Sequence, residues 1–89
     1  MPFADVQIDR FSLLGAHSDA DELYRAGLAC ATADDAEIDL IEAHKWFNLA
    51  AMKGHEDAKT QRAEVAGMLT SAELKLALTA ARDWLKLAH

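Results

Sequence analysis

The chain has 89 residues, with 15 acidic side chains against 9 basic ones, and its formal net charge is −6. This length predicts one domain, and the negative charge opposes binding to a phosphate backbone, so nucleic acid is not expected as a partner. The single cysteine, Cys30, excludes a disulfide within the chain and is typical of a reducing compartment.

No apolar run approaches the ~20 residues of a membrane span, so no membrane insertion is expected. The first residues, Met1-Pro2-Phe3-Ala4-Asp5, lack the basic-then-apolar order of a signal peptide. We therefore expect a cytoplasmic protein, or a periplasmic one only if a leader has been removed.

Residues 1–17 are expected to form an N-terminal capping segment or half repeat. A helix over residues 4–14 would place three apolar side chains on one face: Ala4, Ile8 and Phe11. The run from Val6 to Asp9 also alternates between apolar and polar residues, which favours a short extended segment instead. Both interpretations remain open at this stage.

Residues 19–31 predict a firmer helix, because four residues form a stripe at helical spacing: Leu23, Ala26, Gly27 and Cys30. Two capping boxes compete at its start, Ser18 with Asp21 and Asp19 with Glu22. Gly27 inside a helix costs about 1 kcal/mol relative to alanine. A close approach of a second helix at Gly27 would explain it. Residues 32–38 show no period and are expected to form a loop.

The clearest helix is predicted from Asp39, a good N-cap with Glu42 three residues later, to Lys53 and the turn residue Gly54. One apolar stripe contains Leu40, Ala43, Phe47 and Ala50. Other apolar residues widen the surface beyond this stripe, namely Ile41, Trp46 and Leu49, so two neighbouring helices are expected.

Two more helices follow. Residues 56–67 show a weak stripe of Ala58, Arg62, Val65 and Leu69, with Ala63 and Ala66 small enough for close packing. Thr70 and Glu73 form a capping box for a helix over residues 71–88. Its predicted apolar face consists of Leu74, Ala77, Leu78, Ala81, Leu85 and Ala88.

Weak internal repeats support helix pairs. Phe11-Ser12-Leu13 recurs 36 residues later as Phe47-Asn48-Leu49, and Gly27 and Ala63 have the same separation. The run beginning at Trp46 recurs 38 residues later at Trp84. We interpret these as three helices of one type with two of another type between them.

The run from Asp39 to Ala51, followed by Gly54-His55 and Ala58, resembles the Sel-one-like repeat family of tetratricopeptide-like α-solenoids. Ala26-Gly27-Leu28 is similar to that family's first helix, and residues 68–85 to a common end-helix. Two departures affect the first helix and the loop: Cys30 stands where the family usually has tyrosine, and Ala33-Asp34-Asp35 replaces a glycine-containing loop. The resemblance implies an all-α, short solenoid of stacked antiparallel helix pairs, about two repeats plus a C-terminal end-helix, over residues 18–89.

No constellation of residues predicts chemistry. The histidines, His17, His44, His55 and His89, lack the spacing of a zinc site, and His44 and His55 favour structural roles. Cys30 lies on an apolar stripe near a helix C-terminus, where a thiolate is not stabilised. Asp34 and Asp35 lack the spaced ligands of a calcium loop. We therefore expect no enzyme and no cofactor or metal.

The resemblance implies a protein–protein interaction adaptor or scaffold, in which the first-type helices line the face that binds another protein or peptide. The candidate binding residues on that face are Tyr24, Arg25, Leu28, Thr60, Gln61 and Glu64. A competing interpretation is that Tyr24 and Leu28 pack on the N-terminal segment. We expect a monomer or weak homodimer. The alternative function is a homo-oligomeric structural protein with no separate client.

Overall fold

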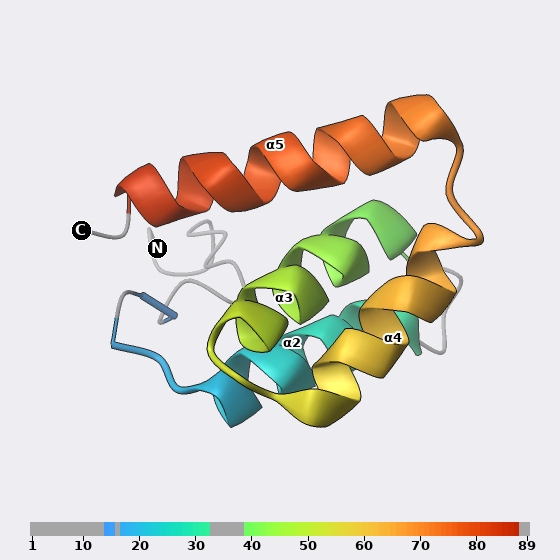
Figure 1. Cartoon of the computed structure of the whole chain (residues 1–89). Coiled ribbons are helices and arrows are strands. Elements are labelled where there is room, and N and C mark those ends of the chain that lie inside the picture. Colours follow the sequence, from blue (N-terminus) through green and yellow to red (C-terminus); the bar gives the residue numbers. More distant parts are fainter. Residues whose placement is uncertain (1–13, 16, 33–38, 88–89) are drawn as a thin grey trace, which may run out of the picture.

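The computed structural model describes residues 14, 15, 17–32 and 39–87, and within them it contains four helices and no strand (Figure 1). These are α2 (Ala20–Ala31), α3 (Leu40–Met52), α4 (Glu56–Ala66) and α5 (Ser71–Leu87). The predicted all-α fold is confirmed. The two interpretations of residues 4–14 fall outside the described residues except at Leu14, and the loop residues 33–38 and Ala88 also fall outside them. No described helix has the length and apolarity needed to cross a membrane.

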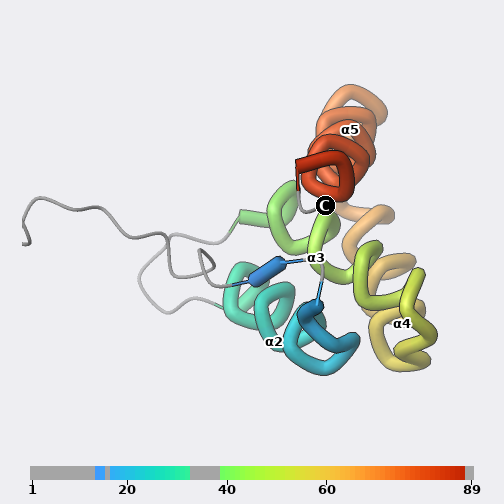
Figure 2. Tube along the Cα trace, turned by 90° about the vertical axis from the view of Figure 1, so that its left-hand side faces the viewer, coloured from blue at the N-terminus to red at the C-terminus, as the bar shows by residue number. Residues whose placement is uncertain are grey.

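Helix α3 is the centre of the fold, because α2, α4 and α5 each pack along it (Figures 1 and 2). Three consecutive residues show how this is achieved, since each residue of a helix points about 100° away from the one before it. Trp46 meets Trp84 of α5, with ring centroids 5.6 Å apart. Phe47 packs on α2, and the Asn48 side chain accepts a hydrogen bond from Arg62 of α4. The prediction of two neighbours for this helix is therefore wrong by one.

The contact between α2 and α3 is close at Gly27. A Cβ atom at this position would lie 2.6 Å from two ring carbons of Phe47. All four residues of the predicted α2 stripe are buried, Leu23, Ala26, Gly27 and Cys30. The expectation that Gly27 permits a close helix–helix approach is confirmed.

The helices begin directly after their N-capping residues. Asp19 with Glu22 and Thr70 with Glu73 each form a reciprocal capping box. Asp39 accepts the backbone N–H of Glu42, but its own N–H donates to the carbonyl of Cys30 at 3.0 Å, and Glu42 pairs with Lys45. The second half of the box predicted at Asp39 is thus replaced by a bond that joins the end of α2 to the start of α3. Gly54 ends α3 with φ +94°, the left-handed conformation that favours glycine.

Two predictions about small and apolar positions in the last helices are wrong. Ala63 is exposed, and the buried residues of α4, Ala58 and Val65, lie 35 residues after Leu23 and Cys30 of α2. The repeat register between these helices is therefore 35, one residue less than the sequence comparison predicts. Leu78 is 48% exposed, because α5 turns Ala77, Ala81 and the half-buried Trp84 toward α3 instead.

Candidate protein-binding groove

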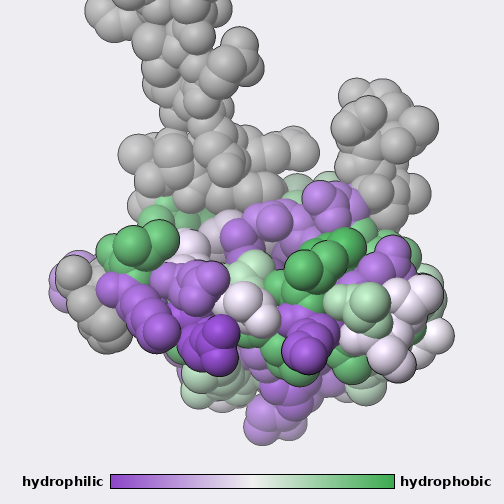
Figure 3. All heavy atoms as spheres, turned by 90° about the horizontal axis from the view of Figure 1, so that it is seen from above, coloured by the Kyte–Doolittle hydropathy of each residue, from purple (hydrophilic) through white to green (hydrophobic). Residues whose placement is uncertain are grey.

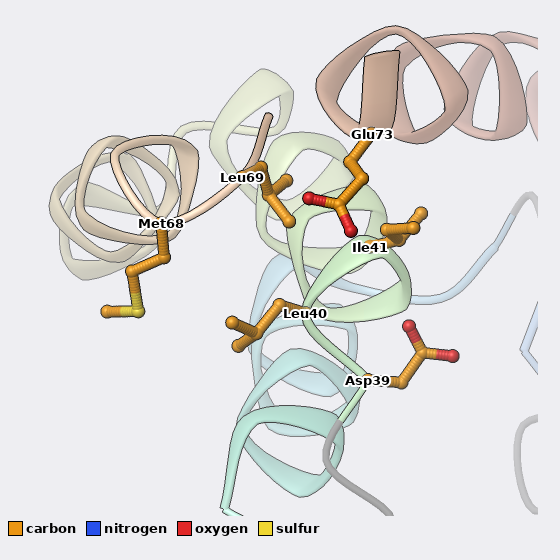
Figure 4. A pocket seen from close by; sticks show the side chains of 6 residues that line it. All are labelled: Asp39, Leu40, Ile41, Met68, Leu69 and Glu73. Carbon is orange, nitrogen blue, oxygen red and sulfur yellow. The ribbon is translucent and has the colours of Figure 1, made fainter. Parts of the chain in front are cut away.

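An open groove of about 280 Å³ lies where the turn from α4 to α5 passes the start of α3 (Figure 4). Six residues line it, Asp39, Leu40 and Ile41 from the start of α3 and Met68, Leu69 and Glu73 from the turn and the start of α5. Helix capping explains why these segments are held here. Asp39 caps α3 and the Thr70–Glu73 box caps α5, so two helix N-termini flank the same hollow.

The apolar lining has two kinds of residue. Leu40 and Leu69 pack against the buried core, and in the close-up they lie between Met68 on one side and Ile41 on the other (Figure 4). Ile41 is half-buried but is not part of that core packing, and Met68 is 63% exposed. Among the described residues, Ile41 and Met68 therefore offer apolar surface that the buried core does not use. We name the six lining residues the turn groove.

Two carboxylates complete the turn groove, and each is fixed in place by a capping bond. Oδ1 of Asp39 accepts the backbone N–H of Glu42 at 3.0 Å, and Oε1 of Glu73 accepts the backbone N–H of Thr70 at 2.8 Å. Within the described part of the chain, the second oxygen of each carboxylate accepts no hydrogen bond. Each group therefore keeps an acceptor that is available to a ligand.

The two apolar residues predicted for partner binding on α2 are used in packing. Tyr24 is half-buried, its ring lies 5.7 Å from that of Phe47, and it stacks on the imidazole of His55 at 4.2 Å. Leu28 is half-buried against the core. Among the described residues, therefore, both side chains already have partners.

The four polar residues that the sequence predicted for partner binding lie outside the turn groove. Arg25 is exposed and pairs with Asp21 at 2.7 Å. Thr60 and Glu64 are exposed on α4, and Gln61 is half-buried. The structure does not bring any of the six predicted residues into the turn groove. The signal that the sequence offered for the groove was Met68, an apolar residue that stands just before the cap Thr70 and belongs to none of the predicted helix stripes.

The histidines that the sequence singled out serve the structure. His55 is the N-cap of α4: its Nδ1 accepts the backbone N–H of Ala58 at 3.1 Å, and its Nε2 lies 3.7 Å from Oδ1 of Asp21. His44 of α3 is buried, and its Nδ1 has no hydrogen-bond partner among the residues that the structure describes. Burial lowers the pKa of His44, and the positive charge of Arg62 lowers it further.

The described residues offer no support for a metal site or for a reactive cysteine. No group of three histidine, cysteine, aspartate or glutamate residues in residues 14–15, 17–32 and 39–87 is placed to hold a metal ion. Cys30 is buried in the core, 6% exposed, where a thiol packs as a small apolar group. The expectation that Cys30 serves packing is confirmed.

Comparisons with protein-family models, curated proteins and solved structures give no match to this chain. The resemblance to Sel-one-like repeats therefore stays a prediction, and residues 39–58 are its most specific part.

Proposed function

We propose that this protein is a non-catalytic interaction module that binds a segment of another protein in the turn groove. The observation that carries the proposal is the apolar surface of Ile41 and Met68, which the core does not use. Exposed apolar groups gathered in a hollow, with polar groups at the edge, are typical of binding sites. A cytoplasmic location and the absence of nucleic-acid partners remain part of this proposal.

The size of the turn groove favours a small anchor over a large ligand. Its volume of about 280 Å³ lies just below the range for small-molecule pockets, about 300–1,000 Å³. Such a hollow suits one or two side chains of a peptide, which would bury Met68 and Ile41. Protein–protein contacts commonly depend on a few buried anchors of this kind.

The proposal also includes membership of the Sel-one-like repeat family. The resemblance supports an adaptor role, because members of that family mostly bind other proteins. We place the proposed binding site in the turn groove and not on the face of α2 that the resemblance implied, since Tyr24 and Leu28 are used in packing.

A random peptide library displayed on phage tests the proposed function. The immobilised full chain selects binders, and the selected pool is then measured on Met68→Ser and on Met52→Ser. Met52 is a matched control, because it is 59% exposed, close to the 63% of Met68. It lies at the end of α3, whereas the turn groove lies at the start of that helix. We expect Met68→Ser to lose most of the binding and Met52→Ser to keep it. If the pool binds both variants as strongly as it binds the unaltered chain, the site lies elsewhere and the proposal is overturned.

The second candidate function is a homo-oligomer, and a specific observation favours it. Helix α5 exposes three leucines, Leu76, Leu78 and Leu87. In the view from above α5, however, hydrophobic patches are separated by hydrophilic side chains (Figure 3), whereas homodimer interfaces usually have an apolar core that is surrounded by a polar rim. Light scattering distinguishes the two candidates. A monomer at micromolar concentration favours the adaptor, and a dimer that Leu76→Lys dissociates favours the oligomer.

A further inference from the structure

We propose that the turn groove selects segments in which an apolar anchor residue is followed or preceded by lysine or arginine. This inference rests on the proposed function and adds the chemistry of the partner. The observation behind it is the charge of the lining. Both charged residues of the turn groove, Asp39 and Glu73, are acidic, and the other four are apolar.

The carboxylates are arranged on one side of the turn groove. Figure 4 shows Asp39 and Glu73 on the same side as Ile41, with Met68 across the hollow from them. An apolar side chain lying against Met68, Leu40 and Leu69 would leave its neighbour in the bound segment next to the two carboxylates. A long basic side chain suits that position, because its methylene groups can cover Ile41 while its charged end reaches the carboxylates.

The helix N-termini do not cancel this negative charge. Each N-terminus carries about half a positive charge, whereas each carboxylate carries a full negative one. Each capping bond also uses only one carboxylate oxygen, Oδ1 of Asp39 and Oε1 of Glu73. The remaining oxygens can accept charge-assisted hydrogen bonds from lysine or arginine. An acidic segment in the same place would meet two unpaired carboxylates and be repelled.

The experiment compares two fluorescein-labelled synthetic peptides. Both contain the same two leucines as apolar anchors. The positions next to the leucines are lysine in one peptide and glutamine in the other. Fluorescence anisotropy with the full chain gives their dissociation constants at low and high salt. We expect the lysine peptide to bind about two- to fivefold more tightly at low salt, the range for exposed ion pairs. The difference should shrink at high salt, because salt screens exposed charges.

Conservative variants assign the preference to the turn groove. Asp39→Asn and Glu73→Gln remove the charge but keep the capping acceptor, since asparagine is as good an N-cap as aspartate and glutamine also completes a capping box. Each should reduce the preference for lysine without loss of stability. Asp83→Asn is the matched control, because Asp83 is an exposed carboxylate toward the other end of α5, and it should leave the preference unchanged.

The outcomes separate the inference from the proposed function. Equal binding of the two peptides, binding of neither peptide, or a lysine preference that survives in both Asp39→Asn and Glu73→Gln would overturn the inference. The proposed function would still stand in each case if the phage-selected pool depends on Met68. If that pool does not depend on Met68, both fall together.

Discussion

The ring of Phe47 occupies the space that a Cβ atom on Gly27 would need, with ring carbons 2.6 Å from that position. The central helix α3 therefore approaches α2 as closely as a side-chain-free position allows. Phe47 is fully buried, so its ring cannot move into solvent to make room.

Gly27→Ala should destabilise the chain by about 1–3 kcal/mol, the usual cost of overpacking a core. The gain of about 1 kcal/mol in helix propensity offsets only part of this cost. Urea denaturation measures the change. Gly67→Ala is the control, because a Cβ atom there meets its nearest backbone oxygen at an ordinary 3.4 Å, and it should leave the midpoint unchanged or raise it. A Gly27→Ala chain as stable as the unaltered one would show that the α2–α3 contact is looser than the structure has it.

Trp46→Ala should lower the free energy of unfolding by about 3–5 kcal/mol, the range for emptying a large core site. Trp46 is 2% exposed and meets the edge of Trp84 across the α3–α5 contact. Trp84→Ala should cost less, because Trp84 is only half-buried. The measurement is the denaturant midpoint of each variant, followed by circular dichroism. If the two variants were equally stable, the assignment of Trp46 to the core and Trp84 to its edge would be wrong.

His55 joins two roles, the cap of α4 and the stack on Tyr24, and two substitutions separate them. His55→Asn keeps a capping acceptor but loses the stack, whereas His55→Ala loses both. Loss of a cap costs about 0.5–2 kcal/mol, so His55→Ala should be the less stable variant by roughly this amount. Thermal unfolding followed by circular dichroism gives the order. Equal melting temperatures for the two variants would mean that the bond from Ala58 to Nδ1 adds nothing to stability.

His44 makes stability depend on pH. Its ordinary pKa is 6.5, and burial together with the charge of Arg62 lowers the pKa in the folded chain. The unfolded chain therefore binds a proton at a higher pH than the folded chain does. The stabilising contribution of neutral His44 is complete above about pH 6.5 and is lost as the pH falls from 6.5 toward the lowered pKa.

A urea series between neutral and mildly acidic pH checks this expectation against His44→Gln, which cannot titrate. The unaltered chain should lose more stability on acidification than the variant does, because all other titratable groups are common to both chains. Parallel pH profiles for the two chains would contradict the expectation. A steeper loss in the variant would do so as well, because it would require the pKa of His44 to be raised on folding.

The sequence by itself determined the four described helices and nearly all of their ends. Capping depends on residues three positions apart, as in Asp19 with Glu22 and Thr70 with Glu73. Both partners of each capping box therefore lie within four consecutive residues and can be recognised from the sequence. Gly54 and the buried stripe of α2 were predicted for the same reason, since one turn or one helix face contains the whole signal.

Only the tertiary structure decided which helix meets which. A stripe shows that a face is buried but not what covers it, so the sequence did not show that Trp46, Phe47 and Asn48 reach three different helices. For the same reason it placed Leu78 inside and left open whether Tyr24 lies on a free face or is packed. The turn groove depends on this arrangement entirely, because Ile41 and Met68 are 27 residues apart in the sequence and become neighbours only when the turn after α4 crosses the start of α3.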